Sequence, residues 1–136
     1  MSLLLSILVL IVALEHLFIM WLEITVPSPR AARAFNISLE KLQQPEIRTL
    51  FANQGLYNGF LAAGLIWSLF AAPELARPLQ AFFLGCVISA ALFGAYTSSK
   101  KILWVQGAPA LLAFLVWLVV SINIMQAVGK LSDGLQ

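Results

Sequence analysis

The chain alternates between four long apolar stretches and shorter segments that hold most of its charged residues. A helix needs about 20 apolar residues to cross the ~30 Å hydrocarbon core of a bilayer. Each stretch is long enough, so the pattern predicts an all-α integral membrane protein. We expect one domain, residues 1–136, folded as a four-transmembrane-helix bundle with helices over residues 3–24, 49–71, 78–97 and 103–125.

Prolines mark the expected helix ends, because proline lacks an amide donor and restricts the residue before it. Pro27 and Pro29 end the first helix. Pro45 fits the first turn of a lead-in to the second helix. Pro73 and Pro78 are expected to enclose a tight loop between the second and third helices.

Composition excludes an ordinary soluble domain. The 136 residues are 61% hydrophobic and 10% charged, whereas soluble domains carry about 25% charged residues. The lipid bilayer is therefore the expected partner. The net charge of +2 is too small to indicate nucleic acid, and no basic run with interleaved aromatic residues occurs. Cys86 is the only cysteine, which excludes an internal disulfide and a thiolate zinc cage.

Basic residues predict the orientation, since short cytoplasmic loops are enriched in Lys and Arg. Six of them lie in the two loops on one side, and two lie on the other side. Both termini are therefore expected on the non-cytoplasmic side, and Trp21 near the cytoplasmic interface. The six are Arg30, Arg33, Lys41, Arg48, Lys100 and Lys101, and the two are Arg77 and Lys130.

The first cytoplasmic loop carries apolar residues at helical spacing. Phe35, Leu39 and Leu42 alternate with charged and polar residues. Such a segment predicts either one short helix lying at the lipid interface or a partly ordered loop.

Ionisable residues interrupt the first apolar stretch, with Glu15 and His16 at its middle and Glu23 at its cytoplasmic end. A carboxylate at mid-bilayer costs at least ~2.5–3.5 kcal/mol, so it needs a partner or a cavity and marks a candidate functional site. At 100° per residue His16 and Glu23 share a face, but they are ~10 Å apart along the axis.

Polar residues on the other helices are predicted to lie in the cytoplasmic half of the bundle, as Glu23 does. Asn53, Gln54, Tyr57 and Asn58 fall within an arc of about 140°. The outer half holds little beyond serines and Cys86. The pattern predicts a pocket open to the cytoplasm, although Asn and Gln also serve as hydrogen-bonding contacts between helices. The candidate ligand-binding residues are Glu15, His16, Glu23, Asn53, Gln54, Tyr57, Asn58, Tyr96 and Gln106.

Three segments resemble the motifs of an uncharacterised domain-of-unknown-function family of small four-helix bacterial integral membrane proteins. They are residues 15–23 (EHLFIMWLE), 53–59 (NQGLYNG) and 106–110 (QGAPA). The resemblance covers nearly the whole chain and implies a multi-pass protein of the bacterial inner membrane. It implies no activity, so it assigns no catalytic residue and names no cofactor.

Three functions stay open, and we favour the first. A cytoplasm-facing pocket would bind or transport an unknown small molecule; the apolar outer half disfavours a simple pore. A membrane-embedded enzyme acting on a lipophilic substrate would use Glu15 or Glu23 as acid or base with His16 as its partner. Metal assistance is a variant of this hypothesis, although no HExxH motif or cysteine cluster indicates a metal. A structural or assembly protein would use Gly55 and Gly59, whose spacing permits a homo-oligomer through that face.

Overall fold

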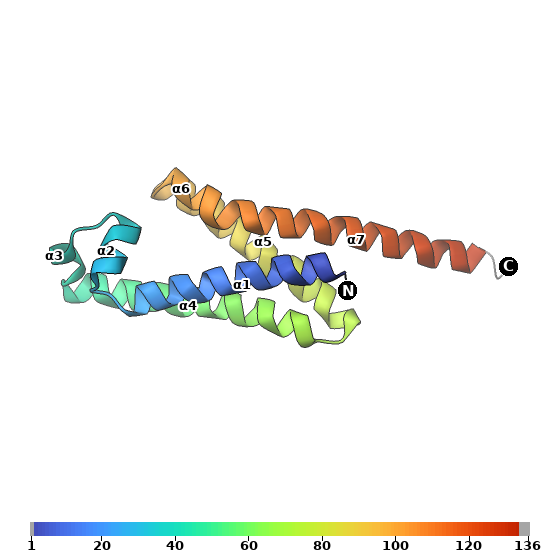
Figure 1. Cartoon of the computed structure of the whole chain (residues 1–136), viewed down its shortest axis with the longest axis horizontal. Coiled ribbons are helices and arrows are strands. Elements are labelled where there is room, and N and C mark those ends of the chain that lie inside the picture. The colour runs from blue at the N-terminus through green and yellow to red at the C-terminus, as the bar shows by residue number, and fades with distance from the viewer. Residues whose placement is uncertain (1, 134–136) are drawn as a thin grey trace.

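The computed structural model describes residues 2–133, and over that range the chain is helical with no strand, which confirms the all-α prediction. Four long helices alternate in direction along the chain, and α1 and α4 lie side by side (Figure 1). The elements are α1 (Leu3–Ile24), α2 (Pro29–Phe35), α3 (Leu39–Leu42), α4 (Pro45–Phe70), α5 (Pro73–Thr97), α6 (Lys100–Ile102), the π-helical turn η1 (Leu103–Gly107) and α7 (Ala108–Asp133).

The long helices begin at capping residues and prolines. Ser2 caps α1 through its side chain, and Pro45 and Pro73 occupy the first turns of α4 and α5. These two helices therefore begin earlier than the predicted residues 49 and 78, and only residues 71 and 72 separate them. Pro78 lies inside α5 near its start, where its missing amide removes a single helix hydrogen bond.

The last helix also differs from its predicted range of 103–125. It begins with α6 at Lys100, passes through η1 and continues as α7 to Asp133. No proline interrupts the second half of α7, so the helix continues. Every residue from Ile122 to Asp133 is exposed, and this part of α7 extends beyond the turn between α4 and α5 (Figure 1).

The main core lies in the half of the fold farthest from α2 and α3. It joins all four long helices through small and branched apolar side chains. The Trp117 indole donates a hydrogen bond of 3.0 Å to the Arg77 carbonyl and ties α7 to the start of α5. The buried core residues are Leu5, Val9, Val12, Ala13, Leu65, Leu84, Val87, Ala110 and Ala113.

A second, smaller core holds α2 and α3 against the start of α4. Leu42 is buried there, and the rings of Phe35 and Phe51 lie 5.0 Å apart. Asn36 adopts a left-handed conformation with φ of 55° and ends α2. Of the two predictions for the segment with Phe35, Leu39 and Leu42, the single short helix is wrong, since the segment forms two short helices. Its location at the lipid interface stays a prediction.

Among the described residues, three helices are long and apolar enough to cross a membrane. They are α1, α5 and the continuous helix from Lys100 to Asp133. The 26-residue α4 is long enough, but its first half carries charged and amide side chains, from Glu46 to Asn58. The candidate residues Asn53, Gln54 and Asn58 are therefore among the side chains that lower the apolar character of α4.

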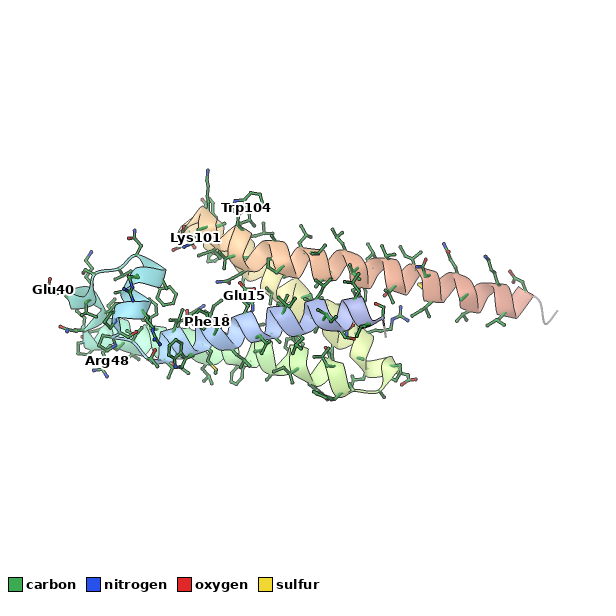
Figure 2. All side chains as sticks on the ribbon, in the orientation of Figure 1. Glu15, Phe18, Glu40, Arg48, Lys101 and Trp104 are labelled. Atoms are coloured by element: carbon green, nitrogen blue, oxygen red, sulfur yellow. The ribbon has the colours of Figure 1, made fainter. Side chains whose placement is uncertain are left out.

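The six basic residues of the predicted cytoplasmic loops gather at one end of the fold. They lie in α2, α3, the start of α4 and α6, and these elements share one end of the long helices (Figure 1). Figure 2 shows Arg48 and Lys101 there. The start of α1 and the turn between α4 and α5 lie at the opposite end.

Candidate functional site

The interface between α1 and α4 contains a buried hydrogen bond between two candidate residues. The amide Nδ2 of Asn58 donates to Oε2 of Glu23 at 2.7 Å and to the carbonyl of Gln54 at 3.3 Å. Glu23 and Asn58 are only 6% and 8% exposed. Because both amide hydrogens have an acceptor, this polar contact is satisfied inside the fold.

Two glycines bring the helices close enough for that bond. A Cβ added to Gly55 would lie 3.2 Å from Cβ of Glu23, and one added to Gly59 would lie 2.7 Å from Sδ of Met20. Small residues permit such an approach. The face predicted for a homo-oligomer is thus packed against α1 of the same chain, and association of copies stays a prediction.

His16 lies on the same buried side of α1 as Glu23. Its Nδ1 lies 2.9 Å from the carbonyl oxygen of Val12, one turn earlier in the same helix. Since a carbonyl only accepts, Nδ1 carries the proton, and in the neutral ring Nε2 is the acceptor. This bond fixes the orientation of the imidazole without joining α1 to another helix.

Glu15 has different surroundings from its neighbour His16. Both of its carboxyl oxygens are buried, and neither has a hydrogen-bond partner within residues 2–133. Successive helix residues point about 100° apart, so Glu15 lies away from the α4 side, and Figure 2 shows it on the edge of α1 turned toward the later helices. A buried carboxyl group without a partner is the exception that most needs an explanation.

The polar face of α4 is exposed at the end near α2 and α3. Asn53, Gln54 and Tyr57 are exposed there. By helix geometry Gly64 lies on the same side as Asn53 and Tyr57, yet Gly64 is buried and directly faces the Phe83 ring of α5. Figure 1 shows the reason, since α4 and α5 meet at their connecting turn and diverge toward the other end.

The two candidates on the later elements differ in exposure. Tyr96 is 89% exposed and points about 140° away from the Phe83 side of α5 that meets α4. Gln106 is half-buried in η1. The structure therefore joins Glu23 with Asn58, keeps His16 and Glu15 partly or fully buried nearby on α1, and leaves Asn53, Gln54, Tyr57 and Tyr96 on the surface.

Two features of the polar interior were missed from the sequence. Gln80 is fully buried in α5, in the half expected to be almost free of polar groups. The sequence did contain a signal for it, because Gln80 is a single amide residue beside an apolar run. The π-helical turn η1, which contains Gln106, had no such signal; π-turns occur frequently at functional sites. Within residues 2–133, no group of three or more His, Cys, Asp or Glu could hold a metal ion.

These helices and their buried polar residues define a small all-helical protein with membrane-length helices. The chain belongs to the family described as protein of unknown function (DUF1304), whose model matches residues 10–118. It is also 42% identical over 119 residues to the uncharacterized protein YpaA of Lactococcus lactis subsp. lactis (strain IL1403), covering 85% of this chain and 97% of that protein. No solved structure matches the chain. The predicted family resemblance is confirmed.

Proposed function

We propose that this protein is a four-span protein of the bacterial inner membrane that binds a small molecule at a polar site reached from the cytoplasm. The connectivity supports the fourth span. The helix α1 ends beside α2, whereas α5 begins at the opposite end of the fold (Figure 1). If α1 and α5 cross the bilayer, the chain between them must cross it too, and α4 is the only helix long enough in that segment.

Charge supports the orientation. The end formed by α2, α3, the start of α4 and α6 carries six basic residues, while Arg77 and Lys130 lie on the other side. Short cytoplasmic loops hold the excess of Lys and Arg. The α2–α3 end then faces the cytoplasm, and both termini face away from it.

The observation that carries the binding site is the pair of partnerless carboxyl oxygens of Glu15. Leaving a buried polar group unsatisfied costs about 1–3 kcal/mol, and a ligand that donates hydrogen bonds would remove that cost. Glu15 and Gln106 both lie next to the main core on its cytoplasmic side, beyond Ala13 and Ala110. The ligand class is therefore a small molecule with N–H or O–H donors, such as a protonated amine.

The packing of the outer half favours binding over a continuous pore. The main core fills that half with Leu5, Val9, Leu65 and Leu84, which are all buried. Transport would need the helices to repack so that this apolar layer opens. The bond between Glu23 and Asn58 and the tight contact at Gly55 hold α1 against α4 and so position Glu15.

The test is ligand-dependent stabilisation of the full chain in detergent. A panel of protonated amines, diamines and guanidinium compounds is screened by thermal unfolding. A compound at 100 times its Kd stabilises by about 2.7 kcal/mol, and the proposal expects this gain in the wild type and its loss in Glu15→Gln. Glu74→Gln removes an exposed carboxyl group from the start of α5 and is the matched control.

A second measurement locates the site independently of the panel. Dicyclohexylcarbodiimide modifies carboxyl groups in apolar surroundings, so peptide mapping should find it on Glu15 and find less of it when a stabilising amine is present. If Glu15→Gln instead loses monodispersity in the same way as Asn58→Ala, Glu15 is a structural residue and the proposed site is wrong.

A further inference from the structure

A second polar feature lies on a different side of α1, where that helix ends and α2 begins. A hollow of about 360 Å³ is present there. Its lining contains two arginines and no acidic residue. The lining residues are Trp21, Thr25, Ser28, Pro29, Arg30 and Arg33.

The groups that line this hollow are mainly hydrogen-bond donors. The Arg30 guanidinium lies 5.5 Å from the centre of the Trp21 ring, a cation–π contact that holds it beside α1. Arg33 follows one turn later in α2. Neither arginine is paired with a carboxylate in the part of the chain that the structure describes. Ser28 accepts from the amide of Ala31, so its hydroxyl hydrogen is available to an acceptor. The hollow therefore suits an anion.

An exposed apolar surface on α1 leads straight to the hollow. Its residues are spaced alternately by four and three positions, so they share one side of the helix, and each is between 41% and 56% exposed. We call them the α1 stripe: Ile7, Ile11, Leu14, Phe18 and Trp21. The Phe18 and Trp21 rings lie 5.8 Å apart at the hollow, and Figure 2 shows Phe18 on α1 toward the α2 end.

We infer that the hollow binds the phosphate group of an anionic phospholipid of the cytoplasmic leaflet, whose acyl chains lie along the α1 stripe. Arginine binds phosphate through paired, charge-assisted hydrogen bonds, and basic pockets beside membrane helices bind anionic headgroups. The α1 stripe selects a lipid rather than a free phosphate, because only a lipid covers the stripe and the hollow together. The inference uses the proposed orientation but needs no ligand at Glu15, whose side chain points about 120° away from Trp21 around α1.

The test measures lipid binding to the full chain by native mass spectrometry in detergent, with phosphatidylglycerol and phosphatidylcholine as probes. Each arginine near an anionic lipid contributes about a fivefold gain in affinity. Arg30→Gln with Arg33→Gln should therefore weaken phosphatidylglycerol binding by about 30-fold. Lys41→Gln with Arg48→Gln removes the same charge from the same end of the fold outside this hollow, and it should change the affinity by no more than about twofold.

Three results would overturn the inference. Equal weakening in the two double variants would mean a diffuse attraction between lipid and the whole basic end. Equal affinity for phosphatidylcholine would remove the headgroup preference. Displacement of the lipid by inorganic phosphate or glycerophosphate at the same concentration would assign the hollow to a free anion. If the arginine pair cannot be purified, Arg33→Gln alone should weaken binding by about fivefold, and an unchanged affinity would also contradict the inference.

Discussion

Glu23 and Glu15 lie eight positions apart on the same apolar helix, but only Glu23 has a hydrogen-bond partner for its carboxyl group among residues 2–133. Around Glu23 the α1–α4 interface is tight. Gly55 has no side chain to keep α1 away, and Asn58 donates a hydrogen bond of 2.7 Å to the Glu23 carboxyl group. Around Glu15 the carboxyl oxygens are buried without a partner in residues 2–133. A satisfied polar group can fix two helices together, whereas an unsatisfied one costs stability and leaves hydrogen-bonding capacity for another molecule.

Gly55→Leu should break the tight interface and have the largest effect. A Cβ at this position already lies 3.1 Å from the carbonyl oxygen of Met20, which is backbone and cannot move aside. Overpacking typically costs about 1–3 kcal/mol, and we expect a loss of unfolding free energy near the upper end of this range, measured by denaturation in detergent. Gly85→Leu is the control, because no atom lies within 4 Å of its added Cβ. Equal losses in both variants would mean that the α1–α4 contact is not special.

Asn58→Leu should destabilise the fold by about 2 kcal/mol, because it leaves the buried Glu23 oxygen without its donor. Replacing both partners by apolar residues is nearly neutral, so the double variant with Glu23→Leu should recover most of the loss. A double-mutant cycle measures this coupling. Additive losses would show that the bond contributes nothing beyond its two side chains.

Glu15→Met should act in the opposite direction and stabilise the ligand-free protein by about 1–2 kcal/mol, since it removes an unsatisfied buried group. Glu46→Gln is the control, because Glu46 is exposed in the first turn of α4 and its replacement should change little. A destabilisation by Glu15→Met comparable to that of Asn58→Leu would show that Glu15, like Glu23, helps to hold the helices together. The two regions would then not differ.

The helices could be predicted from the sequence because apolar length is a local property. The predicted residues 3–24 coincide with α1. The start of α5 at Pro73 could not be predicted, because proline is acceptable both in the first turn of a helix and in a loop. Helix spacing placed Glu23 and Asn58 in the same half of the bundle, but their bond depends on how closely Gly55 lets α1 approach.

The placement of the exposed candidates depended on a contact that no local pattern reveals. The packing of Gly64 against Phe83 joins α4 to α5 near their connecting turn. Beyond that contact the two helices diverge (Figure 1), so Asn53 and Tyr57 become exposed although Gly64 on the same side is buried. The crossing angle between two helices depends on the packing side chains of both. It therefore cannot be predicted from the periodicity of one helix alone.

His16→Leu should have the smallest effect. It tests whether the α1–α4 interface around Glu23 extends along α1 to the level of Glu15. His16 is only 1% exposed, yet its one side-chain hydrogen bond ends on Val12 of the same helix. Removing that bond breaks no contact between helices, and hydrogen bonds in membrane proteins contribute about 0.6 kcal/mol on average. We therefore expect a change in unfolding free energy within about 0.6 kcal/mol in either direction. A loss as large as that of Asn58→Leu would show that His16 helps to hold α1 against α4, and the interface would then extend to the level of Glu15.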